Sequence, residues 1–405
     1  MTKTTTHAHV LRGQLQHYAW GGTEFLAKLL GRDNPTGQPN AEYWLGAHPK
    51  GPGRLPQLDA TLDELIAADP EGLLGRAVNE RFGELPFLFK VLDVKEMLSI
   101  QVHPTKAAAE AGFAREEASG PERSAPDRNY RDDNHKPELG VAVTDFYLLH
   151  GFRDAAAIEA PLRACPAWAE LHDLYRREGL RALYARVMEA DQATVDAWLQ
   201  PVVDAIVATE PGDLLEPEYW VTEAMRTYGS DGHYDRGIFS IFWLNVVRLR
   251  PGQGVFQDAG VPHAYLRGVC LELMANSDNV LRGGLTPKHI DVPELLKHLS
   301  FDAVEPVVLR AETARGESPS WRTYRTPVPD FALSLVNVAA GNTLSLPPQN
   351  APAIYFLCRG KLTAPNEEVQ LDRDERALFV PASASLVLRS EEDTLLYRAT
   401  VNLPH

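Results

Sequence analysis

The segment LSIQVHPTK, residues 98–106, decides the interpretation of the fold because it places polar side chains along one face of a strand pattern. Its apolar residues alternate as the buried face of a β-strand does: Leu98, Ile100 and Val102. Ser99, Gln101 and His103 occupy the other face, and Pro104 ends the run. Strand residues two apart point the same way, so the pattern predicts a strand whose polar face serves a functional site.

Similar strand-like runs recur along the chain. They are separated by Gly and Pro turns and cover residues 86–94, 138–152, 237–256, 268–276, 331–338, 353–364 and 384–390. Many short strands of this kind are typical of jelly-roll barrels, so we predict a mainly β protein with two cupin-type barrels, one catalytic and one C-terminal. The stretch 107–131 is predicted to be a surface loop, and residues 292–299 a short helix.

A helical region interrupts the strands after Asp154. Apolar residues recur there at the spacing of amphipathic helices, in residues 180–188 and again in 195–206. We therefore predict an all-α insert, since 405 residues are also too many for one ordinary core. The expected units are 1–153 and 236–318 for the catalytic domain, 154–235 for the insert and 319–405 for the C-terminal domain.

The composition restricts the partners. The formal net charge is −15, which disfavours nucleic acid and anionic membranes, because both attract basic surfaces. No apolar run is long enough to cross a bilayer, and the first ten residues lack the apolar core of a signal peptide. Three scattered cysteines fit reduced thiols. We expect a cytoplasmic protein that acts on a small molecule as a monomer or weak homo-oligomer.

Four residues from separate segments offer donor atoms for a metal ion: Gln101, His103, Glu138 in NHKPELG and His263 in VPHAYL. Two imidazoles, a carboxylate and an amide oxygen suit a borderline divalent ion, Zn²⁺ best, with room left for water or substrate. Taken singly, each histidine is more often a hydrogen-bonded structural residue, and no CxxC or HExxH spacing is present. From residue types alone both interpretations stay open.

Basic residues form a second candidate set. Lys90 lies inside the apolar run FLFKVLDV, where an unpaired ammonium is costly, and Lys136 is two residues from Glu138. Arg282 and Lys288 flank the loop NVLRGGLTPK, whose two glycines permit close approach of a ligand. These cations could hold a phosphate and stabilise an oxyanion, or could be ordinary surface and ion-paired residues.

Glu272 is the leading candidate for acid–base chemistry. It alternates with Leu271 and Leu273 in LELMAN, which places its carboxylate on the opposite face from these apolar residues. It could equally form an ion pair with one of the basic residues. Asp278 and His135 are further titratable candidates with the same two interpretations.

Five segments together resemble a known family. They are AWGG (19–22), EYWLGAHPKGP (42–52), LPFLFKVLDVKEMLSIQVHP (85–104), YRDDNHKPELG (130–140) and PHAYLRGVCLELMANSDNVLRGGLTPK (262–288). These segments closely resemble the signature segments of type I mannose-6-phosphate isomerases. They are long and in order, and they cover the expected catalytic region almost end to end.

The resemblance implies an aldose–ketose isomerase with one Zn²⁺ per chain, interconverting mannose 6-phosphate and fructose 6-phosphate through an enediol(ate). The implied metal ligands are Gln101, His103, Glu138 and His263. The implied pocket residues are Arg282 near the reacting carbons, Lys136, Glu272 and Lys288, with Ser99 and Lys90 on the phosphate side. We assign proton transfer to Glu272, with His135, Lys136 and Asp278 as alternatives.

Two other functions use the same residues. An Fe²⁺-dependent oxygenase of the cupin type has the same kinds of ligand, but the basic cluster fits an anionic sugar better. A sugar-phosphate-binding module without catalysis is the second, and the presence of every ligand and of Arg282 argues against it.

Overall fold

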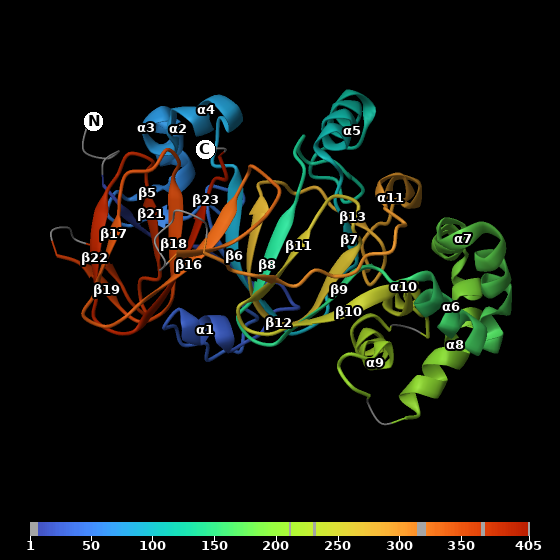
Figure 1. The fold of residues 1–405 in the computed structure, drawn as a ribbon. Coiled ribbons are helices and arrows are strands. Elements are labelled where there is room, and N and C mark those ends of the chain that lie inside the picture. Colours follow the sequence, from blue (N-terminus) through green and yellow to red (C-terminus); the bar gives the residue numbers. More distant parts are fainter. Residues whose placement is uncertain (1–6, 210–211, 230–231, 314–320, 366–368, 404–405) are drawn as a thin grey trace.

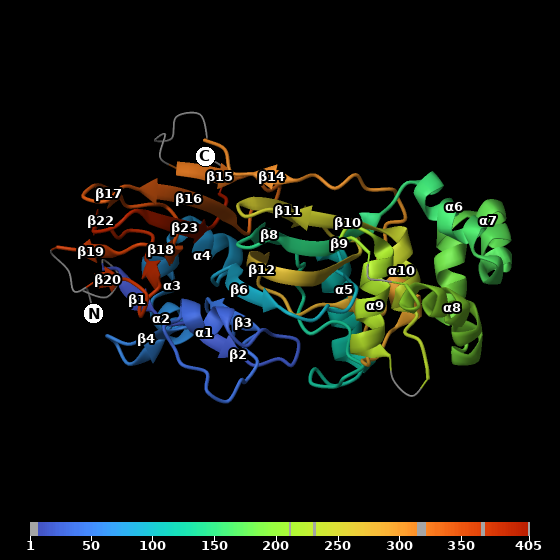
Figure 2. The same ribbon diagram turned by 90° about the horizontal axis from the view of Figure 1, so that it is seen from below.

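The structure is a computed structural model, and it describes residues 7–209, 212–229, 232–313, 321–365 and 369–403. Three zones follow one another along the molecule (Figures 1 and 2). The C-terminal strands lie at one end, the large sheet occupies the middle, and the helices of the insert project at the other end. The predicted mixture of sheets with a helical region is therefore confirmed.

The large sheet is built around two long strands, β6 (Phe87–Val94) and β12 (His263–Ala275). Every residue of β6 is buried, as expected for the central strand of a sheet covered on both faces. Over its second half β12 pairs antiparallel with β6 on one side and with β8 (Glu138–Ala142) on the other. The outer strands are β2 (Gln14–Gln16), β3 (Glu42–Leu45), β11 (Gln253–Gln257) and β14 (Leu309–Arg310).

A second layer shares β12. Over its first half this strand pairs with β7 (Gln101–Val102) and β9 (Phe146–Phe152). The layer is completed by β10 (Leu244–Leu249) on β9 and β13 (Leu281–Arg282) on β7. The strand changes layer at a bulge between Tyr265 and Arg267, followed by Gly268 at φ 118°, where a Cβ would collide with the carbonyl of Asp145.

The C-terminal zone is a pair of sheets around its own apolar core. The larger has the order β1–β21–β18–β23–β16–β15 and the smaller β17–β22–β19–β20. Their bounds are β1 (His9–Leu11), β15 (Trp321–Tyr324), β16 (Ala332–Val338), β17 (Thr343–Leu346), β18 (Ala353–Arg359), β19 (Leu362–Ala364), β20 (Val369–Leu371), β21 (Ala377–Val380), β22 (Leu386–Ser390) and β23 (Thr394–Thr400). Strand β1 thus carries the N-terminal segment into this zone, whereas the predicted units left it in the catalytic domain.

The helices lie at three places. Four short ones accompany the N-terminal strands and the small pair β4 (Arg54–Leu55) and β5 (Ala60–Thr61): α1 (Phe25–Leu29), α2 (Leu62–Ala68), α3 (Pro70–Leu74) and α4 (Arg76–Phe82). Near the second layer are α5 (Lys106–Ser119) and α11 (Val292–His298). The insert contains α6 (Ala155–Ala164), the 3₁₀ turn η1 (Pro166–Trp168), α7 (Ala169–Glu189), α8 (Gln192–Val207), α9 (Pro217–Tyr228) and α10 (Gly237–Trp243). None of the described helices is both long and apolar enough to span a bilayer.

Several element predictions are confirmed and others are wrong. Helices α7, α8 and α11 stand where the periodicity predicted them. Residues 237–243 form helix α10, not the predicted strand. The prediction failed because all seven residues are buried, and a uniformly buried run has no polar face whose period would separate a helix from a strand. The predicted loop 107–131 contains α5, which begins after the N-cap Thr105. The strand expected from Leu98 is reduced to β7.

Candidate metal and substrate site

The predicted metal donors come together where the two layers meet. The Nε2 atom of His103 lies 3.4 Å from one carboxylate oxygen of Glu138, and Nε2 of His263 lies 3.4 Å from the other. One donor atom from each of these three buried residues falls within 4.8 Å of the others. Gln101 is the direct partner of His263 in the pairing of β7 with β12. All four predicted ligands are therefore neighbours.

Main-chain carbonyls orient both imidazoles. Nδ1 of His103 is 2.8 Å from the carbonyl of Asn279, and Nδ1 of His263 is 2.9 Å from that of Val261. With Nδ1–H donating to these carbonyls, each Nε2 is left as a free acceptor, as in many metal sites. The Nε2 of His103 is buried without a hydrogen-bond partner among the described residues. An unsatisfied buried nitrogen facing a carboxylate fits a ligand position for a cation.

The electrostatics favour the metal-binding protonation states. Burial lowers the pKa of His103 to about 4, so its imidazole is neutral near pH 7. Burial alone would raise the pKa of Glu138, but the cation of Lys136, 3.4 Å away, and the contacts with His103 and His263 together outweigh it and hold that pKa well below the usual range. A neutral imidazole and an ionised carboxylate are the forms that coordinate metals.

A second buried charge cluster adjoins the donors. Lys90 on β6 lies opposite Glu272 on β12, with its ammonium 2.9 Å from that carboxylate and 3.4 Å from Glu42 on β3. Burial alone would lower the pKa of Lys90, but the two carboxylates outweigh it and raise it. Burial raises the pKa of Glu272 in spite of Lys90. The charge of Lys90 is already neutralised by carboxylates, and its predicted phosphate contact stays a prediction.

Both clusters line one pocket of about 70 Å³. Its walls are Glu42, Lys90, Leu92, Leu98, Gln101, Lys136, Glu138, His263, Ala264, Tyr265 and Glu272. A single water occupies on the order of 15 Å³ by this measure, so there is space for several waters or for substrate oxygens beside the donors. This openness is typical of a catalytic metal centre and differs from a closed structural one.

The remaining predicted residues lie outside the pocket lining. Asp278 is held by Lys50 at 2.8 Å and His48 at 3.5 Å, and although its burial opposes them, these contacts lower its pKa. His135 is 3.1 Å from Asp330 of the C-terminal zone. Both candidates for proton transfer are therefore held by polar neighbours and are absent from the pocket lining.

Arg282 and Lys288 both lie in the segment that follows β12, Arg282 on the short strand β13 and Lys288 in the loop after it. Arg282 on β13 is the pairing partner of Gln101, which brings it beside the ligand strand. Burial, and after it the charge of Arg282, lowers the pKa of Lys288. Ser99 is half-buried between the pocket residue Leu98 and Ile100.

Sequence reasoning missed four residues at this site. Glu42 and Tyr265 line the pocket, Asn279 orients His103, and Arg131 bonds to Asn279 through its main chain. All four lie within the segments that carry the family resemblance. The sequence alone gave no chemical pattern that separated them from their neighbours.

Known proteins match this chain over nearly its full length. Residues 9–155 match the family model described as phosphomannose isomerase type I, catalytic domain. The mannose-6-phosphate isomerase of Escherichia coli is 40% identical over 386 residues, covering 93% of this chain and 95% of the relative. The apo form of the enzyme from Salmonella typhimurium superposes with a TM-score of 0.85 at 38% identity, covering 98% and 99% of the two chains. A mannose 6-phosphate isomerase bound with zinc and yttrium has a TM-score of 0.84 at 37% identity, covering 98% and 100%.

The fold, the pocket and these relatives define an isomerase. The chain belongs to the mannose-6-phosphate isomerase family, as its resemblance to the type I members predicted.

Proposed function

We propose that this chain interconverts mannose 6-phosphate and fructose 6-phosphate at the described pocket, with one zinc ion held there. The observation that carries the proposal is the presence of Glu272 in the same small pocket as Glu138 and His263. The ligands would be Gln101, His103, Glu138 and His263, whose donor types suit zinc, and a similar solved structure was determined with zinc. The ion would supply Lewis-acid polarisation of a substrate oxygen.

Glu272 is proposed as the base that moves the proton. In the open-chain aldose the C2–H bond breaks as this carboxylate takes the proton, the electron pair forms the C1=C2 bond, and O1 becomes the enediolate oxygen. The proton then returns to C1, while the O2 hydroxyl proton passes to O1 and leaves a ketone at C2. Burial, which raises the pKa of Glu272 above that of an ordinary carboxyl group, suits a group that must both take and give a proton.

The other residues position these groups. Lys90, through its 2.9 Å contact, fixes the Glu272 carboxylate, and Lys136 keeps Glu138 ionised. Arg282 is proposed to stabilise the enediolate charge. Substrate contacts are proposed for Ser99, Lys90 and Lys288. The alternative proton-transfer groups are Lys136, His135 and Asp278.

Architecture and setting complete the proposal. The two sheets that share β12 are proposed to be a cupin-type jelly roll and the C-terminal pair of sheets a related barrel, with the unit limits predicted from the sequence. The protein is proposed to act in the cytoplasm as a monomer or weak homo-oligomer on a small sugar phosphate, without nucleic-acid or membrane partners.

The test is conversion of mannose 6-phosphate by chelator-stripped protein before and after one equivalent of Zn²⁺. We expect activity only with the ion. In D₂O we expect deuterium at C1 of the fructose 6-phosphate formed, because the transferred proton exchanges on a carboxylate. Full activity of the stripped protein would contradict zinc dependence, and complete retention of the substrate hydrogen would contradict exchange of the transferred proton with solvent on Glu272. Tight zinc binding without conversion would contradict the isomerase assignment.

A further inference from the structure

We propose that Arg131, with Lys288, binds the phosphate group of the substrate beside Arg282, whose guanidinium keeps its proposed role at the enediolate, and that the segment from α5 to Arg131 positions the Arg131 side chain there. The proposal rests on the proposed sugar-phosphate isomerase function and deepens it. It names a residue that specifies a phosphorylated substrate.

The first argument is that Arg131 and Arg282 flank the same buried residue. The Asn279 side-chain oxygen accepts the main-chain N–H of Arg131 at 2.7 Å. Asn279 is three residues before Arg282, and its carbonyl holds the imidazole of His103. Asn279 therefore connects the main chain of Arg131 both to the segment that carries Arg282 and to the imidazole of His103.

The second argument is charge. Burial lowers the pKa of Arg282, and the charge of Arg131 lowers it further. The pKa of Lys288 is lowered by burial, then by Arg282 and then by Arg131, so the three cations lie within electrostatic range. In the part of the chain that the structure describes, no carboxylate forms an ion pair with any of the three. Three neighbouring cations without a carboxylate repel one another and favour a multiply charged anion.

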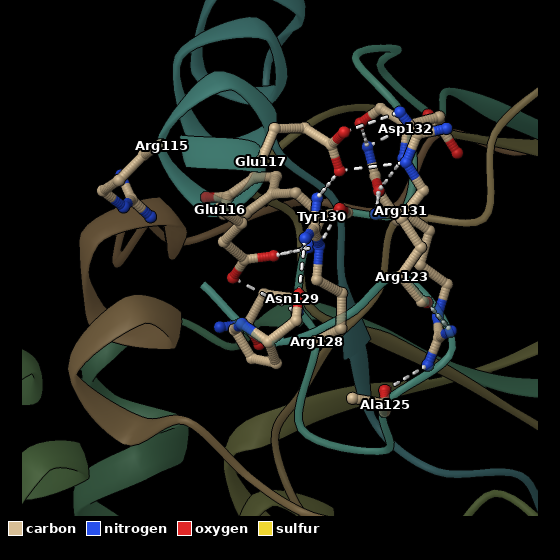
Figure 3. A network of polar contacts seen from close by, with 12 residues as sticks. Arg115, Glu116, Glu117, Arg123, Ala125, Arg128, Asn129, Tyr130, Arg131 and Asp132 are labelled. Carbon is tan, nitrogen blue, oxygen red and sulfur yellow. Dashed lines mark hydrogen bonds and ion pairs between the residues drawn. The ribbon is translucent and has the colours of Figure 1, made fainter. Parts of the chain in front are cut away.

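The third argument is the scaffold beneath Arg131 (Figure 3). The side chain of Arg128 is only 2% exposed and contacts Glu116 at 2.8 Å and Glu117 at 2.7 Å on α5. It also donates to the carbonyls of Pro121 and Tyr130, which folds the segment after α5 back on the helix.

In this arrangement the guanidinium of Arg131 contacts main-chain carbonyls and no carboxylate among the described residues. Its guanidinium donates to the carbonyl of Arg123 at 2.7 Å and to that of Ala125 at 3.2 Å. These bonds use two of the five N–H groups and neutralise no charge, so the planar fork is oriented and can still bind phosphate oxygens.

The cations near the metal donors are different in this respect. Lys90 is paired with Glu272 and Glu42, and Lys136 with Glu138. Their charges balance buried carboxylates inside the pocket. The cations that are not paired with carboxylates, and that can therefore bind a phosphate dianion, lie around Arg131.

The test compares Arg131→Ala with a matched control, Arg123→Ala, in the zinc-loaded full chain. Both changes remove one positive charge from the same segment, but the Arg123 side chain is 62% exposed and contacts Glu117, and the substitution keeps its main-chain carbonyl. We measure kcat and KM for mannose 6-phosphate, and binding of inorganic phosphate by calorimetry. Loss of one charge-assisted contact predicts a rise of about 10- to 100-fold in KM and in the phosphate Kd, with kcat within about twofold. The control is expected to change neither.

Two further variants separate charge from folding. Arg131→Lys keeps the charge and is expected to recover most of the phosphate affinity, whereas Arg131→Gln keeps an amide donor for the carbonyls and is expected to behave as Arg131→Ala. An unchanged phosphate Kd in Arg131→Gln, or an equal rise in Arg123→Ala, would overturn the inference. The outcome is distinct from failure of the proposed function, because phosphate binding is measured even if no mannose 6-phosphate is converted.

Discussion

Replacing Asn279 by alanine tests whether one buried amide connects the metal donors to the surrounding loop. Its side-chain oxygen accepts the main-chain N–H groups of Arg131 and Asp132, and its nitrogen donates to Asp132 and Asn134. Two accepted main-chain N–H groups and the two amide N–H groups, at roughly 1 kcal/mol each, give an expected loss of about 2–4 kcal/mol in the free energy of unfolding. Because the main-chain carbonyl of Asn279 itself holds the imidazole of His103, we also expect zinc affinity to fall about tenfold when this residue loses its side-chain anchors.

The assay combines urea unfolding with zinc competition against a chelator. The matched control is Asn245→Ala, since the Asn245 amide donates to four main-chain carbonyls, among them those of Gly151 and Val304. That variant is expected to lose stability while its zinc affinity stays unchanged. Zinc affinity within twofold of the unsubstituted protein in Asn279→Ala would refute the view that this residue positions His103.

Three other predictions concern the base, a buried carboxyl and the core. Glu272→Gln is expected to abolish turnover with zinc and phosphate affinities nearly unchanged; normal turnover would remove the residue from the role. Burial raises the pKa of Asp93 to about 6, so its stabilising contribution is complete below pH 4 and lost as the pH rises through 6. In urea titrations, the free energy of unfolding of Asp93→Asn, compared with that of the unsubstituted protein, should therefore be about 1–2 kcal/mol more favourable at pH 7.5 than at pH 4. A less favourable comparison at pH 7.5 than at pH 4 would contradict this. Phe89→Ala removes a fully buried ring that packs on Phe356 of β18, and is expected to lower the free energy of unfolding by about 3–5 kcal/mol. Calorimetry should show a single transition for the large sheet and the C-terminal zone, whereas two transitions would show that they unfold independently.

Sequence patterns predicted the elements whose periodicity is strong. The apolar run around Lys90 became the central strand β6, and the spacing within α7 and α8 predicted two helices of the insert. Helix α10 was missed because uniform burial removes the polar face on which period is read. The short helices α1 to α4 lie among turns and carry too few residues for a periodic signal.

The site was predictable by residue type but not by its supporting contacts. The four proposed donor residues were chosen from their ligand chemistry and motifs; the fold groups His103, Glu138 and His263 and pairs Gln101 with His263. The roles of Asn279 and Arg131 arise only from a contact between segments 148 positions apart. Which cations are neutralised also depends on tertiary pairing, as the carboxylates around Lys90 show.

The bulge in β12 determines which face of the strand each side chain points to. His263 and Glu272 are an odd number of residues apart, and on a regular strand such residues point to opposite faces. The extra residue between Tyr265 and Arg267 reverses this parity, so that both side chains reach the same pocket. Apart from Gly268, whose positive φ excludes a side chain, the residues between them are constrained mainly by packing, but the number of residues between them is constrained by this parity. Deleting or adding one residue between them would turn either Glu272, the proposed base, or His263, a proposed metal ligand, out of the pocket, so the length of this interval is more tightly constrained than most of its side chains.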